Sequence, residues 1–217
     1  MLQRATIFSR LSDALLQTLA RRIRLVSLAA GATLFRHGDK ARALYLLVQG
    51  QLKLFRTSAS GDEMIVDLLE PGATFAESRA FLEHPHFHVS CAALGEAEVA
   101  AVDLSTFVTV LHASVDTCLL LLRRMSERAE RQIDHIDRLA LQSGTGRVAG
   151  YLLAQLPPGR DEYPLQVAKG VMASRLAIRA ETLSRILKQL RAEGVVSVSS
   201  RNIVRVHSRQ KLQRLAR

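Results

Sequence analysis

The sequence contains neither glycine nor proline between Leu104 and Leu141, and its leucines and charged residues recur there with the period of an α-helix. This stretch predicts one long helix, about 50 Å long at about 1.5 Å per residue. The sequence differs in character on its two sides. We therefore expect three parts: a first module over residues 1–103, the long helix over 104–141 and a second module over 142–217.

The apolar positions in the second half of this helix are spaced alternately by three and four residues, as the a and d positions of a coiled coil are. They are Leu122, Met125, Ala129, Gln132, Ile136 and Leu139. Little of the chain is left to cover this stripe, so it predicts a parallel homodimer, with Gln132 fixing the register at some cost in stability. The alternative is that the stripe packs against the chain's own β-domain.

Residues 31–103 consist of short runs of β-forming residues punctuated by glycines. The runs are Thr33–Arg36, Leu44–Gln49, Leu52–Thr57, Met64–Leu69, Val89–Ala93 and Glu98–Val102. Runs spaced by about 8–12 residues predict a closed or sandwiched antiparallel β-structure. A segment with helical spacing of its leucines, Ser9–Leu28, precedes them, and Ser12 or Asp13 can cap it. The first module is thus predicted to be a helix followed by a small β-barrel or roll.

All of the excess positive charge lies in the last third of the chain. Residues 1–141 carry 16 Lys or Arg and 16 Asp or Glu, whereas residues 142–217 carry 14 and 4, which accounts for the net charge of +10. A neutral module joined to a basic one predicts that the second module binds a polyanion, and a solvated basic face is the alternative. Gly144 and Gly146 interrupt the helical pattern, so we place the boundary between modules, a candidate hinge, near residues 142–146.

The segment from Leu165 to Arg191 predicts a helix, a tight turn and a second helix, which runs from about Arg179 to Ala192. At about 100° per residue this second helix has an apolar side and an opposite polar side. The polar side consists of Glu181, Ser184, Arg185 and Lys188. Because Arg can donate to guanine O6 and N7 and Glu can accept from cytosine N4, the helix is suited to the major groove of DNA.

Three further residues are better placed for phosphate: Thr182 at the helix start, and Arg175 and Arg179 before it. After Gly194, two alternating runs around Ser200–Asn202 predict a β-hairpin. A helix-turn-helix followed by a hairpin is a winged helix. The alternative is an ordinary amphipathic surface helix.

These residues resemble the CRP/FNR superfamily of bacterial transcription regulators over nearly the full length of the chain. The resemblance rests on the order of β-roll, long helix and winged helix, and on the stretches GTGRVAGYLL and AETLSRILKQLRAEGVVSV. It implies an α+β fold with a cyclic-nucleotide-binding-like β-roll. It also implies a homodimer on an inverted repeat of double-stranded DNA, with half-sites about one helical turn apart, and RNA polymerase as a further partner.

The resemblance also implies roles for three residues of the second helix. In the superfamily, the Glu, Ser and Arg of an E-x-x-S-R helix read a TTGAT-like half-site, and they correspond here to Glu181, Ser184 and Arg185. The cyclic-AMP-responsive branch has an Arg where this chain has Ala180. The similarity is therefore to the FNR-like readers.

The effector is harder to infer. Members that bind cyclic AMP carry a G-E-L sequence and, about ten residues later, an Arg-Ser or Arg-Thr pair, because the cyclic phosphate needs a guanidinium. In PGATFAESRAFLEHPHFHVSCAA, Glu77 is retained, but Ala76 replaces the glycine, and Phe87 and His88 occupy the Arg-Ser position. Cyclic AMP is therefore disfavoured. An iron–sulfur cluster is disfavoured too, because the chain has no N-terminal cysteine cluster and only Cys91 and Cys118 in all.

The stretch T-F-A-E-S-R-A-F resembles the DNR-type subgroup, which lacks the FNR cysteines and responds to nitric oxide through haem. His84, His86 and His88 alternate, so on a strand they would point to one side and could offer imidazole to haem iron or another metal. We favour the other interpretation, a polar loop with exposed histidines. The candidate effector pocket comprises Phe75, Glu77, Arg79, His84, His86 and His88.

Enzymatic function finds little support, because the sequence contains no G-x-S-x-G, H-E-x-x-H or P-loop motif. The rival from another class is a metal-binding β-barrel protein with a basic tail, in which the His84–His88 group supplies the ligands. No apolar run reaches the roughly 18 residues of a membrane span, and the N-terminus lacks the apolar region of a secretory signal. We therefore expect a cytoplasmic protein with no membrane partner.

Overall fold

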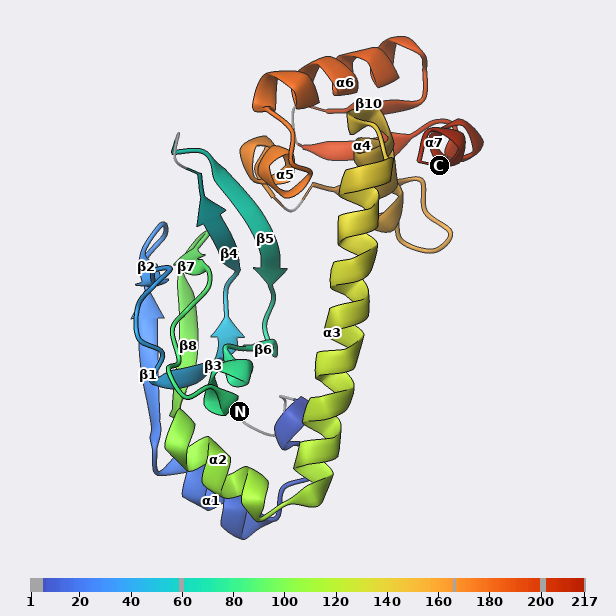
Figure 1. Ribbon diagram of the computed structural model, residues 1–217. Helices are drawn as coiled ribbons and strands as arrows, with labels where there is room; N and C mark the ends of the chain where they lie inside the picture. Colours follow the sequence, from blue (N-terminus) through green and yellow to red (C-terminus); the bar gives the residue numbers. More distant parts are fainter. Residues whose placement is uncertain (1–5, 59–60, 166, 200–201, 217) are drawn as a thin grey trace. The chain divides into compact units, whose positions relative to one another are not determined.

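The computed structural model describes residues 6–58, 61–165, 167–199 and 202–216 (Figure 1). The chain divides into two compact units, residues 1–128 and 129–217, and helix α3 (Val115–Leu141) contributes to both. Among the described residues no single helix is long and apolar enough to cross a membrane. Only α2 (Leu104–His112) and α3 taken together meet that criterion, and they are bent by 117° at their junction.

The first unit is the predicted α+β module. Its elements before α2 are η2 (Thr6–Phe8), α1 (Asp13–Ala20), β1 (Ile23–Leu28), β2 (Thr33–Phe35), β3 (Ala43–Gln49), β4 (Leu52–Thr57), β5 (Glu63–Leu69), β6 (Thr74–Phe75), η3 (Glu77–Phe81), β7 (Ser90–Ala93) and β8 (Ala97–Asp103). The strands form two antiparallel sheets of order β1-β8-β3-β6 and β2-β7-β4-β5. Leu44, Leu47, Leu52 and Val99 are fully buried, which confirms a β-roll with an apolar core.

The predicted helical segment Ser9–Leu28 is wrong in its second half. The helix is confined to α1, where Ser12 accepts a hydrogen bond from the Leu15 amide, as predicted for a cap. The chain then forms β1, which pairs with β8 from Ile23 opposite Val102 to Leu28 opposite Ala97. This pairing satisfies backbone donors and acceptors along one side of β8, a tertiary requirement that overrides the local helical pattern.

The single helix predicted over 104–141 is also wrong. It is broken at Ala113 and Ser114 into α2 and α3. Phe107 and Val110 bury α2 in the core of the roll, whereas Ser114 starts a new helix, because its hydroxyl accepts a hydrogen bond from the Thr117 amide at 3.3 Å. Ser114 thus caps the start of α3, and α2 ends before it, with Ala113 as its C-cap residue and without any glycine or proline. The proposed dimerisation helix accordingly begins at Val115.

Asp103 caps α2, and this cap gives a first prediction. One carboxylate oxygen accepts from the Thr106 amide at 3.0 Å and from the Ser105 hydroxyl. These bonds, that of Ser105 foremost, lower the pKa of Asp103 below its ordinary 3.8. Replacing Asp103 by alanine is expected to cost about 1 kcal/mol of unfolding free energy at neutral pH, measured by urea unfolding.

The pH dependence of this loss has a definite sign. Because the folded state lowers the pKa of Asp103, its charge stabilises the fold above pH 3.8 and ceases to do so as the pH falls through the lowered value. The difference between the native chain and Asp103→Ala should therefore shrink in acid. Asp103→Asn keeps an acceptor and should lose less. A difference that grows in acid would contradict this account of the cap.

The second unit is the predicted winged helix. After the remainder of α3 come α4 (Gly144–Ala154), β9 (Glu162–Pro164), α5 (Lys169–Arg175), α6 (Ala180–Ala192), β10 (Val196–Val198), β11 (Ile203–Val206) and α7 (Arg209–Leu215). The hairpin β10/β11 is confirmed, and β9 adds a third strand that the sequence did not reveal. The turn predicted between these two strands comprises Ser200, Arg201 and Asn202. Asn202 has a left-handed φ of 56°. Ser200 and Arg201 lie outside the described residues.

The two glycines at the predicted module boundary begin α4. Ser143 caps that helix, accepting from the Gly146 amide at 3.1 Å. Gly146 is buried, and a Cβ at this position would lie 3.1 Å from the Leu215 carbonyl oxygen. The glycine therefore lets α7 pack closely on α4. A hinge at residues 142–146 remains a proposal.

Candidate nucleic-acid interface and sensory site

Helix α6 presents the two sides that its sequence predicts. Leu183, Ile186 and Leu190 are buried in the core of the second unit, and the helix packs against β10. Glu181, Ser184, Arg185 and Lys188 are all exposed. Figure 1 shows α6 along the outer edge of its unit, with none of the other described helices and strands of that unit over its outer face. The side chains suited to base edges are thus free to enter a groove.

The start of α6 is open to an anion. Its N-cap residue, Arg179, is exposed and makes no side-chain capping bond to the first-turn amides. Such amides attract phosphate. Thr182 is half-exposed in that first turn, as predicted. The guanidinium of Arg175 instead lies 5.9 Å from the centre of the Tyr151 ring, so this residue packs on α4 through a cation–π contact.

The turn between α5 and α6 is held by a residue that the sequence did not single out. Arg147, on α4, donates to the carbonyl oxygens of Leu176 at 2.8 Å and Gln142 at 2.7 Å, and more weakly to that of Ala177 at 3.5 Å. Ala177 has a φ of 50°, a left-handed conformation that costs a non-glycine residue about 1–2 kcal/mol. Arg147 therefore fixes the strained turn that orients α6.

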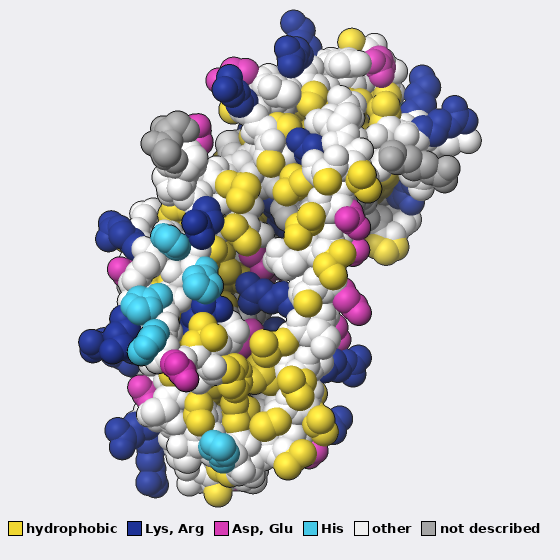
Figure 2. Space-filling view, viewed as in Figure 1, with side chains coloured by type: hydrophobic (Ala, Val, Ile, Leu, Met, Phe, Trp, Pro, Cys, Tyr) yellow, Lys and Arg dark blue, Asp and Glu magenta, His cyan; other side chains and the backbone are white. Residues whose placement is uncertain are grey.

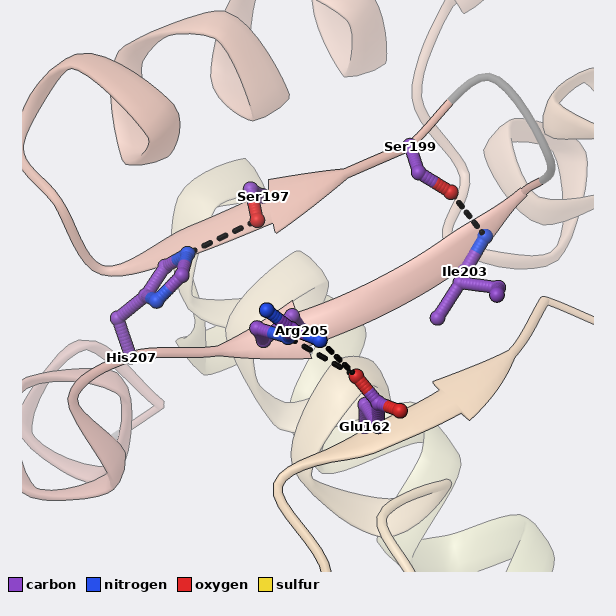
Figure 3. A network of polar contacts seen from close by, with 6 residues as sticks. All are labelled: Glu162, Ser197, Ser199, Ile203, Arg205 and His207. Atoms are coloured by element: carbon purple, nitrogen blue, oxygen red, sulfur yellow. Dashed lines mark hydrogen bonds and ion pairs between the residues drawn. The ribbon is translucent and has the colours of Figure 1, made fainter.

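The three-stranded wing is tied together by side chains from different strands (Figure 3). Arg205 donates twice to one carboxylate oxygen of Glu162, at 2.6 and 2.9 Å, joining β11 to β9. Ser197 pairs with His207 at 2.8 Å, and the Ser199 hydroxyl accepts from the Ile203 amide at 3.2 Å. The wing is thus braced on both sides of β11.

Glu77 is a buried carboxylate of the first unit that lies beside a partly exposed ion pair. It is 7% exposed, and one of its carboxylate oxygens lies 3.9 Å from the guanidinium of Arg128, which also lies 3.8 Å from Asp67. The other Glu77 oxygen, the Thr74 hydroxyl and one guanidinium nitrogen of Arg124 are buried without a hydrogen-bond partner among the described residues. The sequence pointed to Glu77 but not to Arg128, because charge and spacing do not reveal which residue of α3 lies beside it.

The other aromatic and basic residues of the predicted effector pocket have structural contacts. Phe75 is fully buried and stacks on Tyr45, with ring centres 5.3 Å apart. Phe87, at the position of the family's phosphate-binding Arg, is buried and stacks on Phe35 at 3.7 Å. Arg79 is half-buried and donates to the His86 carbonyl at 3.3 Å. Phe75 and Arg79 thus support the roll and the loop beside it.

His84, His86 and His88 lie in an exposed loop between η3 and β7, and His86 alone forms an isolated bridge, with Lys40. The favoured interpretation, a polar loop with exposed histidines, is confirmed, and Arg79 and Arg56 hold this loop through the carbonyls of His86 and His88. Histidines gather on this face of the roll (Figure 2). The pKa of His88 is lowered below its ordinary value, chiefly by the positive charge of Arg79. Among the described residues, no group of three His, Cys, Asp or Glu side chains can hold a metal ion.

The residues of the predicted coiled-coil seam all lie on α3. Leu122 and Ile136 are 59% and 61% exposed, Ala129 is exposed, and Met125, Gln132 and Leu139 are half-buried. Large apolar side chains of α3 thus remain exposed in the single chain.

Comparison with known proteins agrees with this architecture. Residues 25–114 match the cyclic nucleotide-binding domain, and residues 146–215 match the Crp-like helix-turn-helix domain. The cyclic AMP receptor protein of Thermus thermophilus is 32% identical over 171 residues, 76% of each chain. The cAMP-activated global transcriptional regulator CRP of Pasteurella multocida is 26% identical over 178 residues, 80% of this chain and 85% of that one.

Solved structures resemble the chain as well. DNR from Pseudomonas aeruginosa is 32% identical and superposes with a TM-score of 0.53, covering 99% of this chain and 95% of that one. FixK2 from Bradyrhizobium japonicum shares the fold, with a TM-score of 0.76 at 21% identity, covering 90% and 98%.

A β-roll of the cyclic-nucleotide-binding type followed by a Crp-like winged helix defines a DNA-binding transcription regulator. The chain belongs to the CRP/FNR family of such regulators.

Proposed function

We propose that the chain acts in the cytoplasm as a homodimer that reads a TTGAT-like inverted repeat and answers to a signal bound at its β-roll. The observation that carries this proposal is the free polar side of α6, where Glu181, Ser184 and Arg185 are exposed above a buried apolar side. In a parallel dimer, two such helices would enter successive major grooves about one helical turn apart.

Arg185 and Lys188 give the direct test, because they should act differently. Arg185→Ala is expected to weaken binding to the inverted repeat by about 1–3 kcal/mol and to relax the preference at one guanine. Lys188→Ala should weaken binding to all sequences alike and lower its salt dependence, as the loss of a phosphate contact does. Fluorescence anisotropy with the repeat, with single-base variants and with scrambled DNA measures both effects.

Both side chains are exposed, so neither variant should lose its fold, which thermal unfolding checks. An equal loss on specific and scrambled DNA for the two variants would contradict the assigned roles. If both variants bound every DNA as tightly as the native chain does, α6 would not be part of the DNA interface.

We further propose that the effector binds beside Glu77, whose second carboxylate oxygen is buried without a hydrogen-bond partner among the described residues and therefore needs a donor. A cyclic nucleotide is the alternative effector. The position where its phosphate needs a guanidinium holds Phe87, which is stacked on Phe35. Calorimetry with cyclic AMP distinguishes the two: we expect no binding heat, and saturable binding at micromolar concentration would favour the alternative.

Nitric oxide sensed through haem, which the DNR-type resemblance implies, would need an iron ligand other than His84, His86 and His88. These three imidazoles are exposed and do not fit an enclosed haem site. Addition of hemin to the purified chain is the test. A Soret band that responds to nitric oxide and persists after all three histidines are replaced by alanine would support haem at another site, and the lack of a band would remove haem from the proposal.

A further inference from the structure

A cavity of about 330 Å³ opens within the second unit, between the end of α3, the helix α4 and the C-terminal ends of α5 and α7. Ligand pockets in proteins have volumes of about 300–1,000 Å³. Helix α6, which carries the side chains suited to base edges, contributes none of the described residues that line the cavity. The cavity is therefore large enough for a small molecule and lies apart from the polar side of α6.

Gly150 keeps this cavity open. It lies in the interior of α4, where a glycine weakens a helix relative to alanine. A Cβ at this position would meet only the Cβ of Ala216, at 4.0 Å, which is an ordinary van der Waals contact. Close packing requires Gly146 on the same helix, but it does not require Gly150. The effect of this second glycine is to leave the space beside α4 unfilled.

The lining of the cavity is positively charged. Among the described residues it includes Arg147 and Arg175 but no Asp or Glu. Arg147 already donates to three backbone carbonyls, among them that of Leu176. The half-buried Arg175 lies against the ring of Tyr151, and no acceptor in the described part of the chain takes a hydrogen bond from its guanidinium. Arg175 is therefore available to pair with an anion that enters the cavity.

Tyr151 provides a second donor. Burial raises the pKa of its hydroxyl, which therefore stays protonated at neutral pH. The walls also include the apolar side chains of Leu139, Leu176 and Ala216. A carboxylate can accept from a guanidinium and from a hydroxyl, while an apolar body contacts these walls. An inorganic anion would leave the apolar walls uncovered, and a neutral apolar molecule would leave Arg175 without an acceptor.

We propose that this cavity binds a small monocarboxylic acid with an apolar body, whose carboxylate pairs with Arg175. The site lies in the second unit and is separate from the effector site proposed beside Glu77 in the roll. Leu176, in the wall of the cavity, belongs to the turn that Arg147 holds before α6. A bound acid stabilises this unit, because a ligand that binds the folded state alone opposes unfolding.

Benzoate is the probe that tests the proposal, and benzamide is its uncharged counterpart. Titration of benzoate into the full chain should shift the resonances of the Gly150 amide and of the Arg175 Nε–H group saturably in proton–nitrogen correlation spectra. Benzamide should bind about tenfold more weakly or less, because it forms no ion pair with Arg175. Benzoate should also raise the temperature at which the second unit unfolds.

Three variants locate the binding. Gly150→Leu should lower the affinity for benzoate about tenfold or more, since its side chain fills the cavity, and it should stay folded because leucine favours a helix more than glycine does. Gly170→Leu is the matched control: it makes the same change on α5, where a Cβ meets nothing within 4 Å, and should bind benzoate as the native chain does. Arg175→Gln should bind benzoate and benzamide about equally.

Each contrary result overturns a stated part of the proposal. If Gly150→Leu and Arg175→Gln both bind benzoate as tightly as the native chain, the acid binds elsewhere. If the native chain binds benzamide as tightly as benzoate, the site does not select an acid. If neither benzoate nor its aliphatic counterpart hexanoate causes a saturable shift, the cavity binds no such ligand. Thermal unfolding checks the fold of each variant. The titrations contain no DNA, so their outcome is independent of the proposed reading of the inverted repeat.

Discussion

Replacing Ile136 by aspartate is expected to produce a folded monomer that binds the inverted repeat at least about a hundredfold more weakly than the native chain. Ile136 is 61% exposed in the single chain, so the change costs its fold little. In the proposed dimer, it would place two carboxylates against each other in an apolar seam, where unpaired charges are strongly disfavoured. Without the second subunit, only one half-site is held.

Sedimentation gives the oligomeric state of Ile136→Asp, and anisotropy gives its affinity for one and for two half-sites. Arg131→Asp is a strict control, because it puts the same side chain at an exposed position of α3 off the seam and changes the net charge by more. A dimeric Ile136→Asp would show that α3 does not form the interface. A monomer with undiminished affinity for the full repeat would show that the second half-site contributes nothing.

The parts of this structure that were predictable are those with a local cause. The apolar side of α6 was correct because Leu183, Ile186 and Leu190 recur at helical spacing and each needs burial. The strand β4 has the bounds predicted for it, Leu52–Thr57, because turn residues stand on both sides of that run. The basic winged helix likewise follows from charge and periodicity that any reader of the sequence can find.

The parts that were missed depend on partners distant in the sequence. The strand β1 exists because β8, far later in the sequence, needs a neighbour: Ile23 pairs with Val102 and Leu28 with Ala97. The break before Val115 depends on how Phe107 and Val110 fit the core of the roll. Glu77 was retained as a family position, but its neighbour Arg128 comes from another element. The sequence offered one weak sign that Arg147 has a structural role. It is a basic residue next to the buried positions Val148, Ala149 and Leu152 of α4.

Replacing Arg147 by methionine is the second large effect that we expect, a loss of about 3 kcal/mol in the unfolding free energy of the chain's C-terminal unit. The carbonyls of Leu176 and Gln142 would lose a charged donor, and Leu176 is only 8% exposed, so water replaces that donor poorly. The left-handed Ala177 would keep its backbone strain without the bond that helps to hold it. Urea unfolding followed by far-ultraviolet circular dichroism measures the loss.

Arg205→Met is the matched control for this change. It removes an arginine of the same unit and breaks an ion pair of 2.6 Å with Glu162, but both side chains are well exposed, at 62% and 50%. Exposed pairs contribute about 0–1 kcal/mol, so this variant should unfold close to the native chain. Because Arg147 holds the turn before α6, its loss should also weaken specific binding more than scrambled binding at temperatures where the unit stays folded. Equal stability of the two variants would mean that solvent replaces the Arg147 donors, and that the turn before α6 is held by its own backbone.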